Sequence, residues 1–247
     1  MKIEVLFPEF CNLYGDFGNI LYLKACLPGA EFIETPLTET PRFLTEPVDL
    51  VYMGPMSEQK QELILHTLHP LRREIAGAVE SGTRFFCTGN ALELFGDAIF
   101  QKDGSGVRGL GVFRLTAVQS FASRHNSVFL GDFEGEPVTG FKSQFSMGFT
   151  PDGTNERLGL FRVAKGCGLN HDASFEGVWY KNFFGTYLLG PLLVLNPLFT
   201  KRFLALLGEE IPELPFEREA MLAYRQRLKE VQAEDFIAFR RQGQVRK

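Results

Sequence analysis

Cysteine and histidine are the side chains best suited to act as nucleophile and general base near neutral pH, and the 247-residue chain has four of each. The cysteines form no C-x-x-C pair, and none has a histidine at the spacing of a metal site. We therefore predict neither a metal site nor a disulfide framework, and a reducing, cytoplasmic setting. The four cysteines are Cys11, Cys26, Cys87 and Cys167.

The histidines offer no partner for a thiol that the sequence alone identifies. His66 and His69 fall within or near the end of a predicted helix, and His125 lies in a polar turn. His171 is in a predicted loop from which it could approach a cleft, but no residue near it is expected to act as its nucleophile. Since histidine is common at protein surfaces, we predict ordinary surface or capping roles for all four.

The composition is that of a globular protein with a full hydrophobic core. Hydrophobic residues make up 45% and charged residues 23%, and the formal net charge is −4. This mild acidity argues against nucleic-acid binding, which needs a strong basic excess. Phenylalanine occurs 25 times, which predicts extensive aromatic packing.

One segment, residues 182–200, carries no charge and is long enough to cross a membrane. It contains Gly185, Gly190, Pro191 and Pro197, which would interrupt a helix. We therefore predict a buried strand, a turn and the start of a helix there, and no membrane span. Glu4 lies within the first apolar run, so we do not expect a signal peptide.

Apolar runs alternate with helical patterns in the first hundred residues. Strands are predicted at residues 2–7, 48–53 and 83–88, and helices at residues 19–27, from 57 to about 80, and ending at 96. This alternation predicts an α/β fold of the flavodoxin-like type, with a doubly wound, mostly parallel sheet. The second half predicts antiparallel strands at residues 112–118, 127–133, 138–145 and 158–163, a strand at 176–188, and helices at 196–207 and 217–240.

The predicted sheet also indicates where chemistry would take place. In an open parallel sheet, ligands bind beyond the carboxyl ends of the strands. Three predicted loops meet there, at residues 12–19, 54–59 and 87–91. The third is a strand-to-helix turn with small residues at its apex, which is the geometry of a nucleophile elbow.

Five segments of the chain form a recognisable set. They are Leu13-Tyr14-Gly15-Asp16-Phe17-Gly18-Asn19, Met53-Gly54-Pro55-Met56-Ser57-Glu58-Gln59, Gly109-Leu110-Gly111, Glu176-Gly177-Val178-Trp179-Tyr180-Lys181-Asn182 and Gly185-Thr186-Tyr187-Leu188-Leu189-Gly190-Pro191-Leu192-Leu193. Over about residues 1–207 the chain thus resembles the class I glutamine amidotransferases, within them the cobyric-acid-synthase-like branch, and there most closely the glutaminase subunits of lipid II isoglutaminyl synthase. The resemblance implies the amidotransferase fold over 1–207, no cofactor, and a helical extension at 208–247.

The resemblance also locates the family's catalytic pair. The nucleophile motif C-G-G-Y-Q-x-L-G, aligned on its closing glycine, falls on residues 89–96 and places Gly89 at the cysteine position. The G-T-Y-L-H-G-P motif places Leu189 at the histidine position. In this family a thiolate attacks the side-chain amide of glutamine, and the histidine carries the proton to the departing ammonia. Glycine and leucine can do neither, so we expect no catalytic residue at either position.

Cys87 is the fallback nucleophile. Two residues before the elbow, its side chain would lie on the same strand face but about 6–7 Å back along the strand, in the core. There it would be away from the helix N-terminus that could lower its pKa, and a buried free cysteine is usually a small hydrophobic residue. An active Cys87 would instead make the protein a glutaminase that supplies ammonia to a synthetase.

Other parts of a ligand cleft remain. Gly89 can adopt a positive φ without strain, and the backbone N–H groups of Gly89 and Asn90 would face the cleft at a helix N-terminus. Gly54 belongs to the second loop, and Arg124 falls close to the position at which, by the resemblance, an arginine grips the substrate glutamine. We therefore expect the ligand of this cleft to contact Gly54, Gly89, Asn90 and Arg124. Lys142 reverses the charge of the glutamate in the family's G-F-E-N-H segment, which indicates an altered substrate geometry.

Three functions stay open. The first, by resemblance, is an amidotransferase-like protein that has lost glutamine hydrolysis and acts as a scaffold or regulatory subunit for a Mur-ligase-like, ATP-dependent partner in lipid II amidation. The second is an active glutaminase using Cys87, and the third is a non-catalytic sensor of glutamine or a related amide. Dinucleotide binding is disfavoured, because Gly15 and Gly18 lack the G-x-G-x-x-G spacing.

Overall fold

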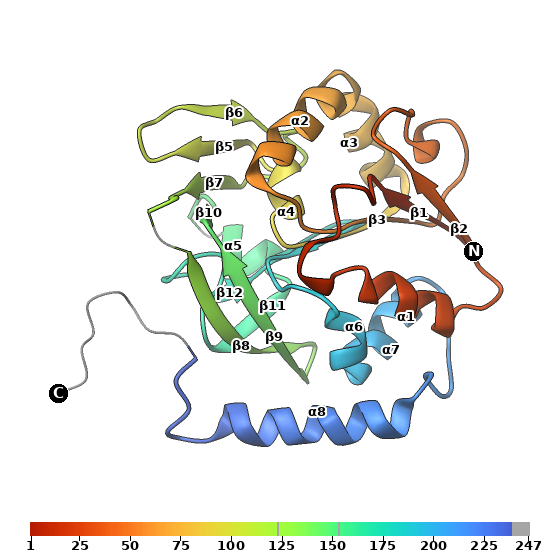
Figure 1. Ribbon diagram of the computed structural model, residues 1–247, viewed down its shortest axis with the longest axis vertical. Coiled ribbons are helices and arrows are strands. Elements are labelled where there is room, and N and C mark those ends of the chain that lie inside the picture. The colour runs from red at the N-terminus through yellow and green to blue at the C-terminus, as the bar shows by residue number, and fades with distance from the viewer. Residues whose placement is uncertain (123, 153, 239–247) are drawn as a thin grey trace.

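A computed structural model describes residues 1–122, 124–152 and 154–238. Its centre is a six-stranded sheet with helices on both faces (Figure 1). The outermost strand, β13, is antiparallel to β14, and the other neighbouring strands are parallel. In spatial order the strands are β13 (Val178–Tyr180), β14 (Phe183–Thr186), β4 (Arg84–Thr88), β3 (Leu50–Met53), β1 (Lys2–Leu6) and β2 (Glu31–Thr35).

Helices cover the two faces of this sheet, and each face has its own hydrophobic core. One face packs against α2 (Glu58–Leu68), α3 (Arg72–Ser81) and α4 (Ala91–Leu94). The other packs against α1 (Gly18–Cys26), α6 (Leu192–Leu195) and α7 (Pro197–Leu206). Strands β1, β3 and β14 are mostly apolar, as expected for strands that are buried on both faces. The predicted doubly wound α/β fold is confirmed.

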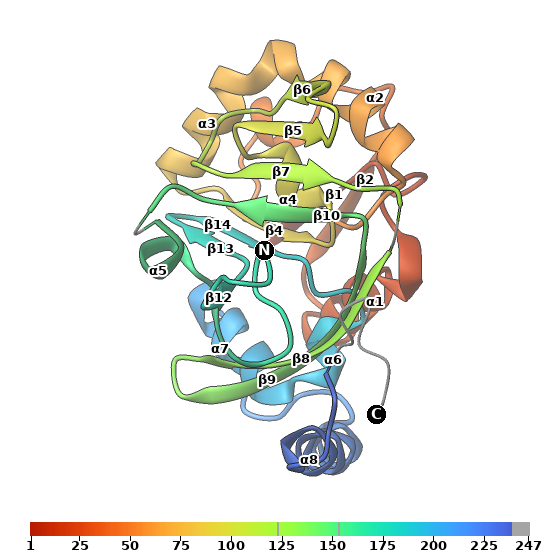
Figure 2. The ribbon, with the colours of Figure 1, turned by 90° about the vertical axis from the view of Figure 1, so that its left-hand side faces the viewer.

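The second half of the chain adds two four-stranded sheets, which lie on opposite sides of the central sheet in Figure 2. One contains β10 (Ser146–Phe149), β7 (Thr116–Gln119), β5 (Ala98–Gln101) and β6 (Gly106–Arg108). The other contains β12 (Phe175–Glu176), β11 (Phe161–Lys165), β8 (His125–Phe133) and β9 (Glu136–Gln144), and a short helix, α5 (Thr154–Leu158), precedes β11. All pairs in these sheets are antiparallel except β5 with β7, so the predicted antiparallel section is nearly correct.

Two predicted elements are wrong in detail. The single helix from 57 to about 80 is divided by the 3-10 turn η3 (His69–Leu71), because Pro70 lacks an N–H and its ring disfavours a continuous α-helix. Ser57 caps α2 by accepting a hydrogen bond from the Lys60 N–H. The single strand at 176–188 is three strands, and Lys181, with φ of 52°, lies in the tight turn between β13 and β14.

The uncharged segment at 182–200 forms β14, α6 and the beginning of α7, as predicted. Among the residues that the structure describes, no helix is long and apolar enough to cross a membrane. The remaining 3-10 turns are η1 (Leu13–Gly15) and η2 (Arg42–Leu44).

The last helix, α8 (Glu217–Gln232), packs against α6, α7 and β9 of the same chain (Figure 1). Its buried residues are Ala220, Tyr224 and Val231, and the Tyr224 hydroxyl donates to the Pro137 carbonyl at 2.6 Å. The predicted helix extended to residue 240, but α8 ends at Gln232 because Ala233 leaves the helical conformation, with φ of −54° and ψ of 143°. Residues 233–238 are not helical, and positions 239–240 lie outside the described residues.

Replacing Tyr224 with Phe tests how firmly α8 is held. We expect the free energy of unfolding to fall by about 1 kcal/mol, because the Pro137 carbonyl loses its partner in a buried contact. Tyr180→Phe is the matched control, since its hydroxyl bonds the exposed Glu80 carboxylate, and it should change stability by less than about 0.5 kcal/mol. Urea denaturation measures both, and equal losses would contradict a buried role for the Tyr224 hydroxyl.

Candidate functional site

The turn between β4 and α4 has the backbone of a nucleophile elbow. Gly89 stands at its apex with φ of 59°, the left-handed conformation that glycine adopts without strain. It lines a cavity of about 100 Å³ at the carboxyl ends of the central strands. The cavity is lined by Leu13, Tyr14, Pro55, Met56, Ser57, Glu58, Gly89, Asn90, Arg124, Ser143, Gln144, Phe145, Ser146, Tyr187 and Leu189. Below it is called the elbow cavity.

Neighbouring side chains fill the space that a side chain at position 89 would need. A Cβ atom placed on Gly89 would lie 2.5 Å from the Pro55 Cβ and 3.3 Å from the Leu189 Cδ2. The first distance is far inside van der Waals contact, and the Pro55 ring cannot rotate away. The elbow backbone is therefore retained while the room for a nucleophilic side chain is not.

Three of the four predicted ligand-binding residues line the elbow cavity. Asn90 uses its side chain to hold the loop after β3, since it accepts from the Met56 N–H and donates to the Met56 carbonyl. Arg124 reaches across the mouth, where it bonds the Tyr14 hydroxyl and lies 4.2 Å above the Phe145 ring centroid. Gly89, which has no side chain, lines the cavity with its backbone.

Gly54, the fourth, is not among the lining residues of the part that the structure describes. It is buried, and a Cβ there would lie 2.4 Å from the Cys11 carbonyl oxygen and 2.6 Å from Asp16 Oδ2. Its lack of a side chain thus permits close packing below the site, which spacing alone did not distinguish from ligand contact.

Asp16 supports the elbow from below. It is fully buried and accepts hydrogen bonds from Tyr52, from Thr88 Oγ1 at 2.9 Å, from Asn19 Nδ2 at 3.2 Å and from the Gly190 N–H at 3.1 Å. These donors belong to or adjoin β3, β4, α1 and the segment after β14. Burial raises the pKa of the Asp16 carboxyl to about 6.

Residues 2–196 match the sequence model of the CobB/CobQ-like glutamine amidotransferase domain. The chain belongs to this amidotransferase family. It is 26% identical over 187 residues to the lipid II isoglutaminyl synthase (glutamine-hydrolyzing) subunit GatD of Staphylococcus aureus (strain N315), with 75% of each chain covered. It is 27% identical over 204 residues to the subunit of the same name from Streptococcus pneumoniae (strain ATCC BAA-255 / R6), with 79% of this chain and 76% of that one covered.

The fold is also that of an amidotransferase. A crystal structure of a glutamine amidotransferase matches with a TM-score of 0.53, over 83% of this chain and 99% of that chain. The identity to it is 17%, so this likeness concerns the fold alone. The family predicted from the five motif segments is confirmed.

Cys87, the fallback thiol, lies on β4 with no exposed surface. Burial raises the pKa of its thiol well above the ordinary value, and it does not appear among the described residues that line the elbow cavity. Neutral, buried thiols are poor nucleophiles. Cys11, Cys26 and Cys167 are also buried.

Two of the histidines lie close together near a cysteine. The loop after β11 turns so that His171 Nδ1 lies 3.7 Å from Cys167 Sγ, a contact that the sequence did not indicate. The His125 ring packs edge-on against His171, and burial lowers the pKa of His125 to about 4. Cys167 is only 1% exposed, so its thiol is not open to a substrate.

Lys142 is the residue that replaces the family's glutamate. It is not among the described residues that line the elbow cavity, and it forms a fully buried ion pair. Its Nζ is 3.3 Å from Glu176 Oε1, and it donates to the carbonyls of Cys167 at 3.1 Å and Gly168 at 2.6 Å. Lys142 therefore ties β9 to the loop after β11 and to β12.

Sequence reasoning missed the buried acid beside the elbow. Glu93 is fully buried, accepts from Gln61 Nε2 at 2.7 Å and from the Ser146 hydroxyl, and burial raises the pKa of its carboxyl to about 7. Ser146 also lines the elbow cavity. The available signal was the motif alignment, in which position 93 is the family's glutamine.

Glu93→Gln should therefore make stability less dependent on pH. The folded-state pKa lies above the ordinary value, so the folded protein holds an extra proton between about pH 4.5 and 7 and loses stability as pH rises through that window. Glutamine has no charge; its oxygen can accept from Gln61 Nε2 and its NH2 group can donate to the Ser146 oxygen. We expect a gain of about 2 kcal/mol at pH 8 and little change at pH 4.5. Urea denaturation across this range measures it.

Asp16 serves as the internal reference for that experiment. Because its pKa is raised to about 6, Asp16 lowers the free energy of unfolding of both proteins by the same amount as the pH rises from about 4 to 6. If the free energy of unfolding of Glu93→Gln changed with pH between 6 and 8 as steeply as that of the unaltered protein, the raised pKa of Glu93 would be contradicted.

Proposed function

We propose that the protein is an amidotransferase-like subunit without glutaminase activity, which acts as a scaffold or regulatory subunit for a Mur-ligase-like, ATP-dependent partner in lipid II amidation in the cytoplasm. The pathway and the partner rest on likeness to the GatD subunits. Residues 1–207 would form the amidotransferase-like unit and residues 208–247 an extension outside it.

One observation carries the loss of activity. The position that the family's motif assigns to the nucleophile holds glycine, and Pro55 and Leu189 occupy the space around it. Glutamine hydrolysis in this family needs a thiolate and a proton carrier at this place. The buried Cys87 thiol, with its raised pKa, supplies no thiolate at neutral pH.

Glutamate release from glutamine tests this proposal. The purified chain, alone and co-expressed with a Mur-ligase-like partner, should release glutamate no faster than buffer. Release that disappears in a Cys87→Ala variant would overturn the proposal in favour of an active glutaminase that supplies ammonia through Cys87. Release that survives Cys87→Ala would point to another nucleophile and would overturn it equally.

A specific observation also favours the sensor function. Gln144 Oε1 is buried and accepts no hydrogen bond among the described residues, whereas the buried Tyr187 hydroxyl interacts with Glu93 and Ser146. Both residues line the elbow cavity, with Arg124 at its mouth. A buried polar atom is costly without a partner, and a bound amide with its carboxylate on Arg124 would supply a donor to Gln144 Oε1.

Calorimetry with glutamine and glutamate tests ligand binding without turnover. The sensor function predicts heat that Arg124→Ala abolishes. Arg114→Ala is the matched control, because Arg114 is an exposed arginine that pairs with Asp97 outside the elbow cavity. If neither ligand produced heat, the sensor function would be excluded and the scaffold function would remain.

A further inference from the structure

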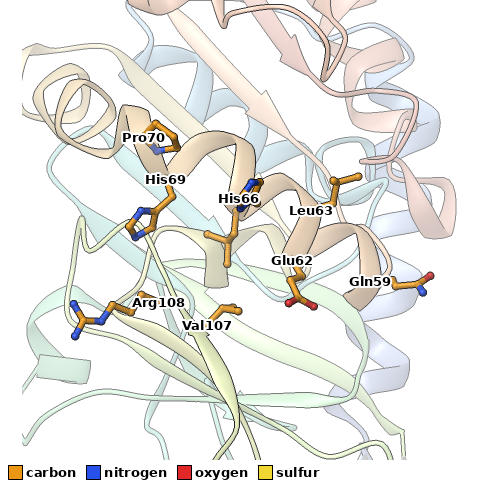
Figure 3. Close-up of a pocket in the computed structure, with 9 residues that line it drawn as sticks. Gln59, Glu62, Leu63, His66, His69, Pro70, Val107 and Arg108 are labelled. Atoms are coloured by element: carbon orange, nitrogen blue, oxygen red, sulfur yellow. The ribbon is translucent and has the colours of Figure 1, made fainter.

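A second hollow lies away from the elbow cavity, between α2 and the edge strand β6 (Figure 3). It has a volume of about 720 Å³ and joins a neighbouring hollow of about 430 Å³, since Gln59, Glu62 and Val107 line both. Together they form one groove along the helix, called the α2–β6 groove below. Leu65 and Val107 give it an apolar middle.

The β6 side of the groove has free backbone hydrogen-bonding groups. Gln101 donates to the Ser105 carbonyl and Gly109 to the Asp97 carbonyl, so the bonds to β5 fall on alternate residues. By this register Val107 bonds β5, whereas the N–H and C=O groups of Gly106 and Arg108 point away from it. In the described chain neither amide donates to another residue. An open strand edge of this kind can pair with an added strand.

The two ends of the groove differ in charge. His66, His69 and Arg108 line one end, and Figure 3 shows His69 and Arg108 near each other there. Glu58 lines the other end, beside Gly106 and next to the elbow cavity that Glu58 also lines, and Glu62 lies where the two hollows meet. The groove therefore complements a segment that carries an acidic group at one end and a basic group at the other.

We propose that the α2–β6 groove binds an extended peptide segment of a partner protein, which pairs with the edge of β6 and places a basic, an apolar and an acidic side chain at alternate positions along α2. Backbone pairing supplies affinity in this mode, and side-chain pockets supply specificity. A small anion would use only the basic end.

The dimensions agree with this occupant. Alternate residues of a strand face the same side, so residues i and i+4 lie about 13 Å apart. The lining of α2 and η3 extends from Gln59 to His69, which is about 15 Å along a helix. Three consecutive inward-facing side chains therefore span the groove from its acidic to its basic end.

The test uses capped seven-residue peptides with Lys, Val and Asp at alternate positions, in both orders because the added strand can run either way. Amide hydrogen exchange in the full chain is followed by NMR. We expect one order, at saturation, to slow exchange at Gly106 and Arg108 by about tenfold or more. The same peptide with proline at its centre should have no effect, since it lacks the donor.

A matched pair of variants separates backbone from charge. Arg108→Ala keeps the outward N–H and should weaken binding by about two- to fivefold. Arg108→Pro removes that N–H without touching the bonds of Val107 to β5, and should abolish binding. Equal effects of the two variants, or unchanged exchange at both amides with every peptide, would overturn the proposal. So would binding of N-acetylaspartate as tight as that of the peptides.

Discussion

Lys142→Met should be among the most destabilising single substitutions in this protein, with a loss of about 3 to 5 kcal/mol in the free energy of unfolding. Lys142 and Glu176 both have no exposed surface, and their charged atoms lie 3.3 Å apart. Methionine fits the space but leaves the Glu176 carboxylate buried, with Thr186 and the Tyr187 N–H as its remaining donors among the described residues. Water cannot replace the lost cation there, so the carboxylate loses its charge compensation.

The matched control is Lys181→Met. Lys181 also pairs with a glutamate, Glu80, but both side chains are nearly half exposed, so the loss should be under about 1 kcal/mol. Chemical denaturation of both variants gives the comparison. The double variant Lys142→Met/Glu176→Gln should be more stable than Lys142→Met alone, because no uncompensated charge remains. A loss below about 1 kcal/mol in Lys142→Met would contradict the buried pair.

Gly89→Ala should also be strongly destabilising, with a loss of about 2 to 5 kcal/mol in the free energy of unfolding. The added Cβ meets the Pro55 Cβ at 2.5 Å, and overpacking of this kind costs about 1 to 3 kcal/mol. The positive φ adds strain of about 1 to 2 kcal/mol for any residue with a side chain. Gly29→Ala is the control, because a Cβ there meets nothing within 4 Å.

The same clash predicts the outcome of an attempted restoration. Gly89→Cys with Leu189→His puts both catalytic types back, yet glutamate release should stay at the buffer rate because Pro55 displaces the thiol. Adding Pro55→Gly should recover about 1 to 3 kcal/mol of the loss in Gly89→Ala. Additive effects of Pro55→Gly and Gly89→Ala would show that Pro55 does not close position 89.

The sequence predicted the sheet, the elbow and the family, because these follow from local patterns: apolar runs, a glycine-rich turn and motif spacing. It missed β2, β5, β6 and β10. These strands have four residues on average, and β2 and β6 lie at sheet edges where side chains are only partly buried. Short edge strands carry little hydrophobic signal.

The candidate site divides in the same way. Gly89, Asn90 and Arg124 were found, since motif position identifies them and the fold brings them to one cavity. The closure by Pro55 and the Cys167–His171 contact were not, because each depends on a distance between loops rather than on spacing along the chain. Lys142 was noticed for its charge, but only the packing reveals Glu176 as its partner.

The hydrogen bonds around Asp16 bear on how such a protein changes over evolutionary time. Four donors from separate parts of the chain converge on this carboxyl, and neither position 89 nor position 189 contributes a side chain to them. The reactive side chains at these two positions can therefore be lost while the architecture persists. A survey of all single substitutions should find Asp16 nearly invariant and Leu189 permissive to other apolar residues, so that survival of the fold carries no information about survival of the chemistry.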